Sequence, residues 1–358
     1  MTDDAAWMGA ALALAARGLG RVWPNPAVGC VLVAQGRVVG RGRTADGGRP
    51  HAEAAALAEA GPLARGATAY VTLEPCAHHG ATPPCADALV AAGVARVVAA
   101  LGDPDPRTDG GGIARLRAAG VAVTEGVREA EARTLQQGFL SRLARGRPTL
   151  TLKLAQTLDG RIATARGESR WITGPPARLH VHARRAAHDA VMVGGGTARA
   201  DDPRLTVRGM GDGPRPVRVV MARRLALAPD AALLRTAREA PVWLLHHDGD
   251  AEAAEAAGAV AIPCPLRGGR LDPEAALGRL GGRGLTRVYC EGGGTLAASL
   301  LRAGLVDRLE LYTAGAAIGA EGRPGLGPLA LAALADAPRL RLAACRAIGP
   351  DLFSAWEP

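Results

Sequence analysis

His51-Ala-Glu53, followed by Pro75-Cys76 and, after eight further residues, by Cys85, is the stretch around which this chain is organised. One imidazole and two thiolates suit Zn²⁺, and three protein ligands leave one tetrahedral position for water. Glu53 lies two residues beyond His51 and is expected to be a carboxylate that does not bind the metal. Its role would be to take a proton from the metal-bound water and pass it on. The stretch therefore predicts one hydrolytic zinc site per chain, held by His51, Cys76 and Cys85.

This combination of residues is the signature of the zinc-dependent nucleobase deaminases. A purely structural zinc knot is the main alternative, and it would need a fourth ligand such as His78 or His79. That alternative leaves the acidic residue and the proline of the motif without a role. A disulfide between the two cysteines is disfavoured, because six cysteines in 358 residues indicate a reducing compartment.

The spacing of the two cysteines departs from the common Pro-Cys-x-x-Cys pattern of deaminases. The eight residues from Ala77 to Pro84 are too many for one turn, so this loop must fold back on itself. Gly80 with Pro83-Pro84 provides the residues that favour such a turn. Cys85 then begins a run of helical character, where the helix dipole favours a thiolate.

Composition limits the class of protein. A hydrophobic content of 48% supports packed cores, and the length of 358 residues suggests two domains. The chain has no apolar run of about 18 residues and no basic leader, so we expect neither a membrane span nor export, and a cytoplasmic protein. The net charge of +9 could indicate nucleic-acid binding, but aromatics make up only 3% and the arginines are scattered. A phosphorylated small molecule and an anionic cofactor would account for the charge instead.

The first part of the chain alternates between the periods of helices and strands. We expect helices at 3–19, 51–60 and 85–93 and another beginning at 110, and strands at 28–33, 37–42, 69–73, 94–101 and 121–124. This order predicts a three-layer α/β domain over residues 1–145, closed by residues 136–140 and followed by a linker. Asn25, in a turn between two prolines, could read the polar edge of a base or cap its own backbone.

Residues 146–358 predict a second α/β domain. We expect strands at 149–155, 190–193, 217–221, 242–245, 287–290 and 309–312, and a helix at 175–187. Three glycines, 292–294, follow one of these strands and precede a helix beginning near Thr295. Such a turn suits a phosphate, although a plain tight turn is the alternative because the spacing is not that of a Rossmann fingerprint.

Lys153 is the only lysine among 43 basic residues. Arginine cannot lose its proton and is a planar fork rather than a point charge. A lysine retained in so arginine-rich a chain indicates a site where arginine would fail, with chance survival as the alternative.

Along essentially its full length the chain resembles the bifunctional riboflavin-biosynthesis deaminase/reductases. The resemblance rests on Pro24–Cys30, His51–Glu53, Thr72–Cys85, Lys153–Arg161, Gly167–Thr173 and Thr197–Arg208. The long insert between the two cysteines, unusual among deaminases, is normal in this family.

The resemblance implies a cytidine-deaminase-like first domain and a dihydrofolate-reductase-like second domain. It implies zinc-dependent hydrolytic deamination of 2,5-diamino-6-(5-phosphoribosylamino)pyrimidin-4-one, with release of ammonia. NADPH would then reduce the ribosyl group to ribityl by hydride transfer to C1′. Members of the family tend to form dimers or tetramers, so a homo-oligomer is expected, with no nucleic-acid or membrane partner.

The resemblance also implies roles for individual residues. Lys153 and Asp201 would be the polar pair near the site of hydride transfer, and Asn25 a substrate contact in the first domain. The other substrate contacts would be Ser169, Arg185 and Arg208 on the phosphate, Leu205 packing nearby, and Glu291 on the pyrimidine or ribose. Cofactor contacts would be Ala155, Trp171, Thr197, Asp201, Gly293, Gly294, Thr295, Leu296, Ala297, Ala298 and Ser299. For Trp171 the alternative is ordinary core packing.

One departure from the family concerns cofactor selectivity. After the strand at 217–221 the family usually has Asp-Ser, where this chain has Ala222-Arg223. Arg223 or Arg224 would then face the 2′-phosphate, so we expect NADPH to be preferred over NADH. The competing function is a nucleic-acid or nucleoside deaminase with a C-terminal targeting domain; a zinc-stabilised binding module without chemistry is a third possibility.

Overall fold

The computed structural model describes residues 4–79, 83–211, 213–249 and 251–358. The turn expected at Gly80 lies outside the described residues. The chain divides into two compact units, the first ending at Gly146 and the second beginning at Arg147. Each unit has its own sheet and its own hydrophobic core.

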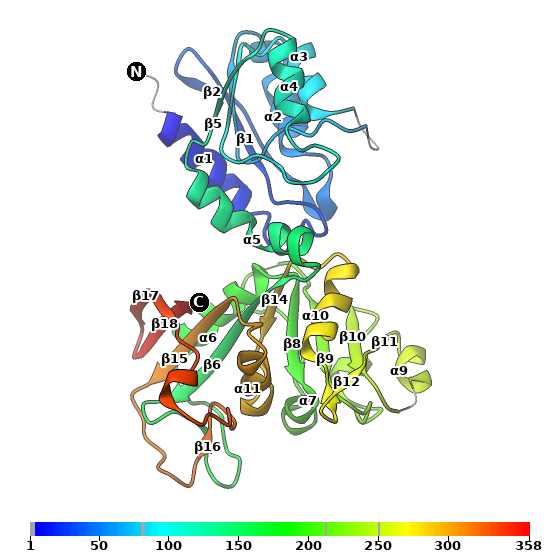
Figure 1. The fold of residues 1–358 in the computed structure, drawn as a ribbon, viewed down its shortest axis with the longest axis vertical. Coiled ribbons are helices and arrows are strands. Elements are labelled where there is room, and N and C mark those ends of the chain that lie inside the picture. The colour runs from blue at the N-terminus through cyan, green and yellow to red at the C-terminus, as the bar shows by residue number, and fades with distance from the viewer. Residues whose placement is uncertain (1–3, 80–82, 212, 250) are drawn as a thin grey trace. The chain divides into compact units, whose positions relative to one another are not determined.

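The first unit is built on a five-stranded sheet (Figure 1). Its strand order is β2 (Arg37–Arg43), β1 (Gly29–Ala34), β3 (Thr68–Val71), β4 (Arg96–Ala99) and β5 (Ala122–Glu125). The hairpin of β1 and β2 is antiparallel, as is the pairing of β1 with β3, whereas β3, β4 and β5 run parallel. The strands expected from the sequence are all present, with ends that differ by a few residues.

Helices cover both faces of this sheet, with α1 and α5 on one face and the other three on the opposite face (Figure 1). They are α1 (Asp4–Ala16), α2 (Ala52–Ala60), α3 (Cys85–Ala91), α4 (Gly111–Ala118) and α5 (Glu129–Arg145). Glycines in the strands allow the helices to pack closely on the sheet. A Cβ on Gly29 of β1 would lie 2.0 Å from the Ala11 carbonyl oxygen of α1. On the other face, a Cβ on Gly42 would lie 2.2 Å from the Ala52 carbonyl oxygen. Helix α2, which carries Glu53, is therefore seated directly on β2.

Helix α5 was not expected as a helix from the sequence. It has 17 residues and includes the segment 136–140 that the sequence suggested only as the end of the domain. Phe139 and Ala132 are buried, and the buried Gln136 side chain donates to the Ala27 carbonyl at 2.7 Å. The buried face of α5 includes a glutamine and a glycine, so its hydrophobic residues do not recur at the helical period. For this reason the helix could not be recognised from the sequence.

The second unit contains a nine-stranded sheet (Figure 1). Its strand order is β11 (Val260–Pro263), β10 (Val242–His246), β9 (Val217–Met221), β8 (Ala190–Gly194), β14 (Arg287–Cys290), β6 (Thr149–Thr157), β15 (Arg308–Ala314), β18 (Asp351–Glu357) and β17 (Arg341–Ile348). The first seven run parallel, and the last two are antiparallel. Short two-stranded pairs join β12 (Leu266–Arg267) to β13 (Arg270–Leu271) and β7 (Arg161–Ala163) to β16 (Arg323–Pro324).

The helices of this unit are α6 (Pro175–Ala186), α7 (Gly195–Asp201), α8 (Ala232–Arg235), α9 (Glu252–Ala256), α10 (Pro273–Gly282) and α11 (Gly294–Arg302). Helix α6 packs its Ala177 and Val181 against Tyr289 and Tyr312 of the sheet. Helix α10 begins with a proline after Asp272, whose carboxylate accepts a hydrogen bond from the Glu274 N–H at 3.0 Å. No helix in the described part of the chain is long and apolar enough to cross a membrane.

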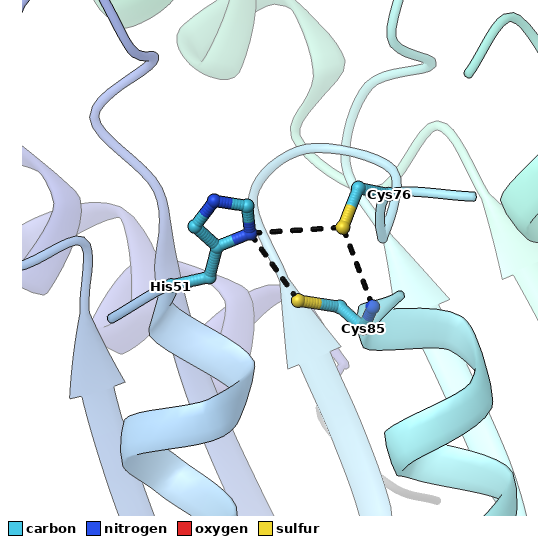
Figure 2. A group of neighbouring side chains, drawn as sticks. All are labelled: His51, Cys76 and Cys85. Atoms are coloured by element: carbon cyan, nitrogen blue, oxygen red, sulfur yellow. Dashed lines mark hydrogen bonds between the residues drawn. The ribbon is translucent and has the colours of Figure 1, made fainter. Parts of the chain in front are cut away.

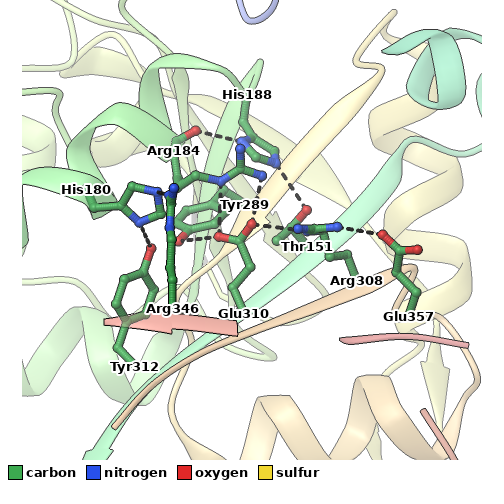
Figure 3. A network of polar contacts seen from close by, with 10 residues as sticks. All are labelled: Thr151, His180, Arg184, His188, Tyr289, Arg308, Glu310, Tyr312, Arg346 and Glu357. Atoms are coloured by element: carbon green, nitrogen blue, oxygen red, sulfur yellow. Dashed lines mark hydrogen bonds and ion pairs between the residues drawn. The ribbon is translucent and has the colours of Figure 1, made fainter. Parts of the chain in front are cut away.

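A buried ion-pair network lies between α6 and the sheet (Figure 3). Glu310 of β15 is fully buried, and Arg184 of α6 binds its two carboxylate oxygens at 2.7 and 3.1 Å. Arg308 contacts the same carboxylate at 3.2 Å, and the Tyr289 hydroxyl donates to it at 3.2 Å. Glu310 pairs in register with Lys153 of β6, so the network shares a sheet face with that lysine.

Removing the charge of Glu310 should destabilise the second unit. The Glu310→Gln variant leaves two guanidinium groups without their buried partner, and we expect a loss of about 3 kcal/mol in the free energy of unfolding. The matched control is Glu357→Gln, because Glu357 also pairs with Arg308, at 2.5 Å, but its side chain is 32% exposed. That control should lose less than about 1 kcal/mol. Urea unfolding of both variants checks the difference; equal losses would contradict it.

Candidate functional site

The three metal ligands predicted in the first unit converge on one point (Figure 2). His51 directly precedes α2, Cys76 follows the end of β3, and Cys85 is the first residue of α3. The His51 Nδ1 atom lies 3.6 Å from the Cys76 sulfur and 3.4 Å from the Cys85 sulfur. Tetrahedral zinc with its usual bond lengths would separate such atoms by about 3.6 Å. The donor set and its spacing therefore fit Zn²⁺.

The surroundings of this group argue against a closed structural zinc knot. Within the described residues, which omit 80–82, these three are the only group of histidine, cysteine or acidic side chains placed to hold a metal. His78, considered above as a fourth ligand, places its Nδ1 3.4 Å from the Thr108 hydroxyl instead. Three protein ligands would leave the fourth position of a tetrahedral zinc ion open, as expected from the sequence.

Glu53 lies in the first turn of α2 and is almost fully buried. Burial raises the pKa of its carboxyl to about 7, and the Cys85 thiol is close enough to hydrogen-bond with it. The hydrogen bond from the Cys85 thiol lowers the pKa of Cys76 to about 4, so one sulfur is poised as a thiolate. A carboxyl group placed beside the ligand sulfurs can hold a proton at the site without binding the metal itself.

Glu74 holds the loop that carries Cys76, a role that the sequence analysis missed. Its two oxygens accept hydrogen bonds of 2.9–3.2 Å from the backbone N–H groups of Asp103, Gly110, Gly112 and Ile113. A Cβ on Gly112 would lie 1.9 Å from the Pro75 carbonyl oxygen, so the start of α4 rests on the residue before Cys76. The only signal in the sequence was an acidic residue directly before Pro-Cys.

Asn25 lies beside the loop that leads into His51. A Cβ on Gly48, whose φ is +91°, would lie 1.8 Å from the Asn25 side-chain nitrogen. The Asn25 backbone N–H donates to the Val22 carbonyl at 3.0 Å. The Asn25 side-chain amide therefore packs against Gly48, three residues before the metal ligand His51. Contact between Asn25 and the substrate remains a prediction.

A cavity of about 1810 Å³ occupies the second unit. It lies at the carboxyl ends of the parallel strands β14, β8 and β9, where ligands of such sheets bind, and beside the middle of β6. All but two of the site residues predicted for this unit line the cavity. The lining residues among them are Lys153, Ala155, Ser169, Trp171, Arg185, Thr197, Asp201, Leu205, Arg208, Glu291, Gly293, Gly294, Thr295, Leu296 and Ser299. The two exceptions, Ala297 and Ala298, are buried on the core side of α11.

Two glycine turns meet inside this cavity, one after β8 and one after β14. The Gly293 N–H donates to the Thr197 hydroxyl at 3.2 Å, which joins the two turns. A Cβ on Gly294 would lie 3.0 Å from the Pro324 carbonyl oxygen, so a side chain there would crowd this backbone. Helix α11 begins here at Gly294, and the N-terminus of a helix favours a phosphate.

Lys153 forms an ion pair with Glu291. Its Nζ lies 3.9 Å from a Glu291 oxygen, and Arg185 binds both oxygens of the same carboxylate at 2.5 and 3.0 Å. Burial lowers the pKa of Lys153, and the Glu291 charge offsets part of this. Burial alone would raise the pKa of Glu291, but the charges of Arg185 and Lys153 outweigh it and lower the pKa to about 2. Asp201 lines the same cavity.

Trp171 and His182 complete one wall of the cavity. Trp171 is 67% exposed, with the Arg178 guanidinium 4.8 Å from its ring centre, so the core-packing alternative is wrong. His182, which the sequence analysis did not single out, accepts a hydrogen bond from the Arg208 N–H at 3.3 Å. Burial and the charges of Arg185 and Arg208 lower the pKa of His182 to about 4, so its ring is neutral at pH 7.

Comparison with protein families assigns the two units separately. Residues 1–101 match the family described as cytidine and deoxycytidylate deaminase zinc-binding region. Residues 148–354 match the RibD C-terminal domain.

Known proteins similar over the whole chain carry both units. The riboflavin biosynthesis protein RibD of Escherichia coli is 43% identical, over 98% of both chains, and that of Aquifex aeolicus is 39% identical, over 98% of this chain and 97% of its own. The solved structure of Acinetobacter baumannii RibD has a TM-score of 0.89 and 37% identity, covering 99% of this chain and 98% of that one. A diaminohydroxyphosphoribosylaminopyrimidine deaminase/5-amino-6-(5-phosphoribosylamino)uracil reductase from Thermotoga maritima gives a TM-score of 0.87 and 32% identity over the same shares.

Proposed function

Because the chain belongs to the RibD family of bifunctional riboflavin-biosynthesis enzymes, we propose that the zinc site of its first unit and the cavity of its second catalyse two successive reactions. The first is hydrolytic deamination of 2,5-diamino-6-(5-phosphoribosylamino)pyrimidin-4-one, in which water replaces the ring amine and ammonia leaves. The second is reduction of the ribosyl group to ribityl with NADPH. The observation that carries this assignment is the buried Glu53 beside a group of one histidine and two cysteines.

In the first unit, His51, Cys76 and Cys85 would hold Zn²⁺. When bound, the ion supplies a Lewis acid that makes water a nucleophile near neutral pH. Glu53 would move the protons, taking one from the attacking water and delivering one to the departing amine. Asn25 would orient the pyrimidine from its place beside the loop that leads into His51.

In the second unit, the glycine turn 292–294 with Ala155, Trp171, Thr197 and the start of α11 would hold NADPH. The cofactor supplies the hydride equivalent, and the protein positions the ribosyl carbon that receives it. Lys153 and Asp201 would flank the reacting centre, where the lysine can give or hold a proton. Glu291 would contact the substrate while it keeps the lysine in place.

Phosphate recognition is proposed for Ser169, Arg185 and Arg208, with Leu205 packing beside them. Arg185 donates to the Thr206 carbonyl at 2.8 Å as well as to Glu291, so its charge is offered from a fixed position. A fixed guanidinium loses little entropy when an anion binds, which favours it as a phosphate ligand.

The two-step function is tested by adding the diaminopyrimidine ribonucleotide to the purified chain, with and without NADPH. Ammonia should be released in both reactions, and NADPH should be consumed afterwards, one molecule for each ammonia. Deamination of an oligonucleotide in preference to this substrate would support the nucleic-acid deaminase instead. Absence of NADPH consumption after ammonia release would limit the function to the first step.

A homo-oligomer, dimer or tetramer, is proposed as the working form. Strand β17 ends the nine-stranded sheet, and its residues from Arg341 to Ala347 are all exposed. Such an open edge favours pairing with a second copy of the chain. Light scattering should give a multiple of the 36.5 kDa chain mass, and proline in place of Ala344 should shift it toward the monomer. A monomeric wild type would contradict the proposal.

None of the six cysteines forms a disulfide in the structure, which supports a reducing, cytoplasmic location. We propose no nucleic-acid or membrane partner.

A further inference from the structure

Four arginines line the cavity at the carboxyl ends of β8 and β9: Arg199, Arg223, Arg224 and Arg270. We refer to them as the strand-end arginines. They meet there because β8 and β9 are parallel neighbours, with Gly194 paired to Met221 at their last residues. Arg223 and Arg224 directly follow Ala222 at the end of β9, and Arg270 belongs to the short strand β13. Such a concentration of positive charge suits a multiply charged anion.

The position of these arginines in the sheet indicates which part of the cofactor would reach them. Strands β6, β14, β8 and β9 are consecutive neighbours, so β9 lies about 14 Å from Lys153 at a spacing of about 4.8 Å per strand. The two glycine turns that would hold the diphosphate lie between them, after β14 and β8. A dinucleotide with its nicotinamide near Lys153 therefore places its adenosine ribose near the end of β9.

Arg223 is already committed to other groups. Its Nε lies 2.8 Å from a carboxylate oxygen of Asp248, and its Nη1 donates to the Gly269 carbonyl at 3.2 Å. The hydrogen bond from Arg223 lowers the pKa of Asp248, so this carboxylate remains charged. The pair ties the loop after β10 to the turn before Arg270. It also offsets the negative charge of Asp248, which would repel a phosphate.

Arg224 differs from Arg223 in this respect. Its main chain is fixed by a backbone bridge to Asp248, and the next residue, Leu225, donates to the Asp248 carbonyl at 3.1 Å. Arg224 is exposed and lines the cavity, and its side chain makes no hydrogen bond or ion pair with any residue that the structure describes. Its charge acts on Asp248 only through space. Arg199 instead folds back over its own helix, with Nη1 3.1 Å from the position of a Cβ on Gly195.

We propose that Arg224 binds the 2′-phosphate of NADPH and so determines the preference for this cofactor over NADH, while Arg223 neutralises Asp248. This inference rests on the proposed use of the cavity for the cofactor. It distinguishes the two arginines that the sequence left equivalent, because Arg223 uses its Nε and Nη1 on Asp248 and Gly269 and Arg224 makes no such bond with a described residue.

Binding of small probes to the full-length chain tests the inference without any turnover. Calorimetry would compare 2′,5′-ADP, which carries the 2′-phosphate, with 5′-AMP, which lacks it, and with ribose 5-phosphate, which probes the substrate phosphate site. The Arg224→Ala variant should bind 2′,5′-ADP about 10- to 100-fold more weakly, as expected for loss of a charged hydrogen bond. Its affinities for 5′-AMP and ribose 5-phosphate should stay unchanged.

Two control variants separate this role from loss of charge or of structure. The double variant Arg223→Ala with Asp248→Ala removes a neutral pair and should keep its affinity for 2′,5′-ADP within about 3-fold. Arg339→Ala removes one exposed charge outside the cavity and should have no effect. The inference is overturned if Arg224→Ala keeps the preference for 2′,5′-ADP, or if the double variant loses it. A wild type that binds neither adenine nucleotide would overturn the cofactor site itself.

Discussion

Replacement of Glu53 by glutamine should reduce ammonia release by about 10²- to 10⁴-fold while the protein keeps its zinc. Glutamine has the same shape but cannot accept and return a proton. The three ligand side chains are left unchanged, because Glu53 is not one of them. Initial rates of ammonia release, together with metal analysis of the same sample, check both halves of this prediction.

The matched control for this variant lies on the same helix. Glu59→Gln alters a carboxylate near the end of α2 that accepts a hydrogen bond from the Arg41 N–H at 2.9 Å, away from the metal ligands. Its rate of ammonia release should remain within about 2-fold of the wild type. A Glu53→Gln variant with bound zinc and unchanged turnover would contradict the hydrolytic assignment.

Replacement of Lys153 by methionine should reduce NADPH oxidation by about 10²-fold or more and leave ammonia release unchanged. The Lys153 side chain is only 16% exposed, and its ammonium lies 3.9 Å from a Glu291 carboxylate oxygen and 6.0 Å from the centre of the Tyr312 ring. Arginine should not restore activity, because a larger, permanently charged group would stand beside Arg185. The assay supplies the deaminated intermediate directly, so that the first unit plays no part. Activity retained in Lys153→Arg would contradict the need for a protonatable point charge.

The protonation of Lys153 can be followed without interference, because no other lysine occurs in the chain. Burial lowers the pKa of its ammonium, so it loses its proton at a lower pH than a free lysine. If the charged form is active, NADPH oxidation falls as the pH rises through this lowered pKa. Reductive methylation with ¹³C label gives one lysine signal whose titration measures the pKa directly. A value at or above the ordinary range for lysine would contradict the effect of burial.

The metal ligands could be predicted from the sequence because their chemistry is specific and two of them adjoin predictable helix starts. His51 and Cys85 each stand at the beginning of an α-helix, and Cys76 follows a strand. Most parallel strands of both units were also evident, since each is a short apolar run bounded by turn residues. The edge strand β11 was missed.

Side-chain contacts that depend on the order of strands in the sheet, and burial that depends on the rotation of a helix about its axis, could not be predicted. Lys153 meets Glu291 because β6 and β14 are neighbours in a sheet whose strand order is not the chain order. Ala297 and Ala298 face the core because of the rotation of α11, which the glycine turn before it does not reveal. The backbone contacts of Glu74 required the placement of α4, and the antiparallel β17 and β18 were not recognised at all.

The proposed deamination depends on a zinc ion with three protein ligands and an open position beside Glu53. X-ray absorption at the zinc edge of the wild-type chain measures this coordination directly. We predict one zinc per chain with two sulfur neighbours, one imidazole nitrogen and one light atom that does not come from the protein. A third sulfur or a second imidazole in the coordination shell would show a closed structural site and contradict the hydrolytic function.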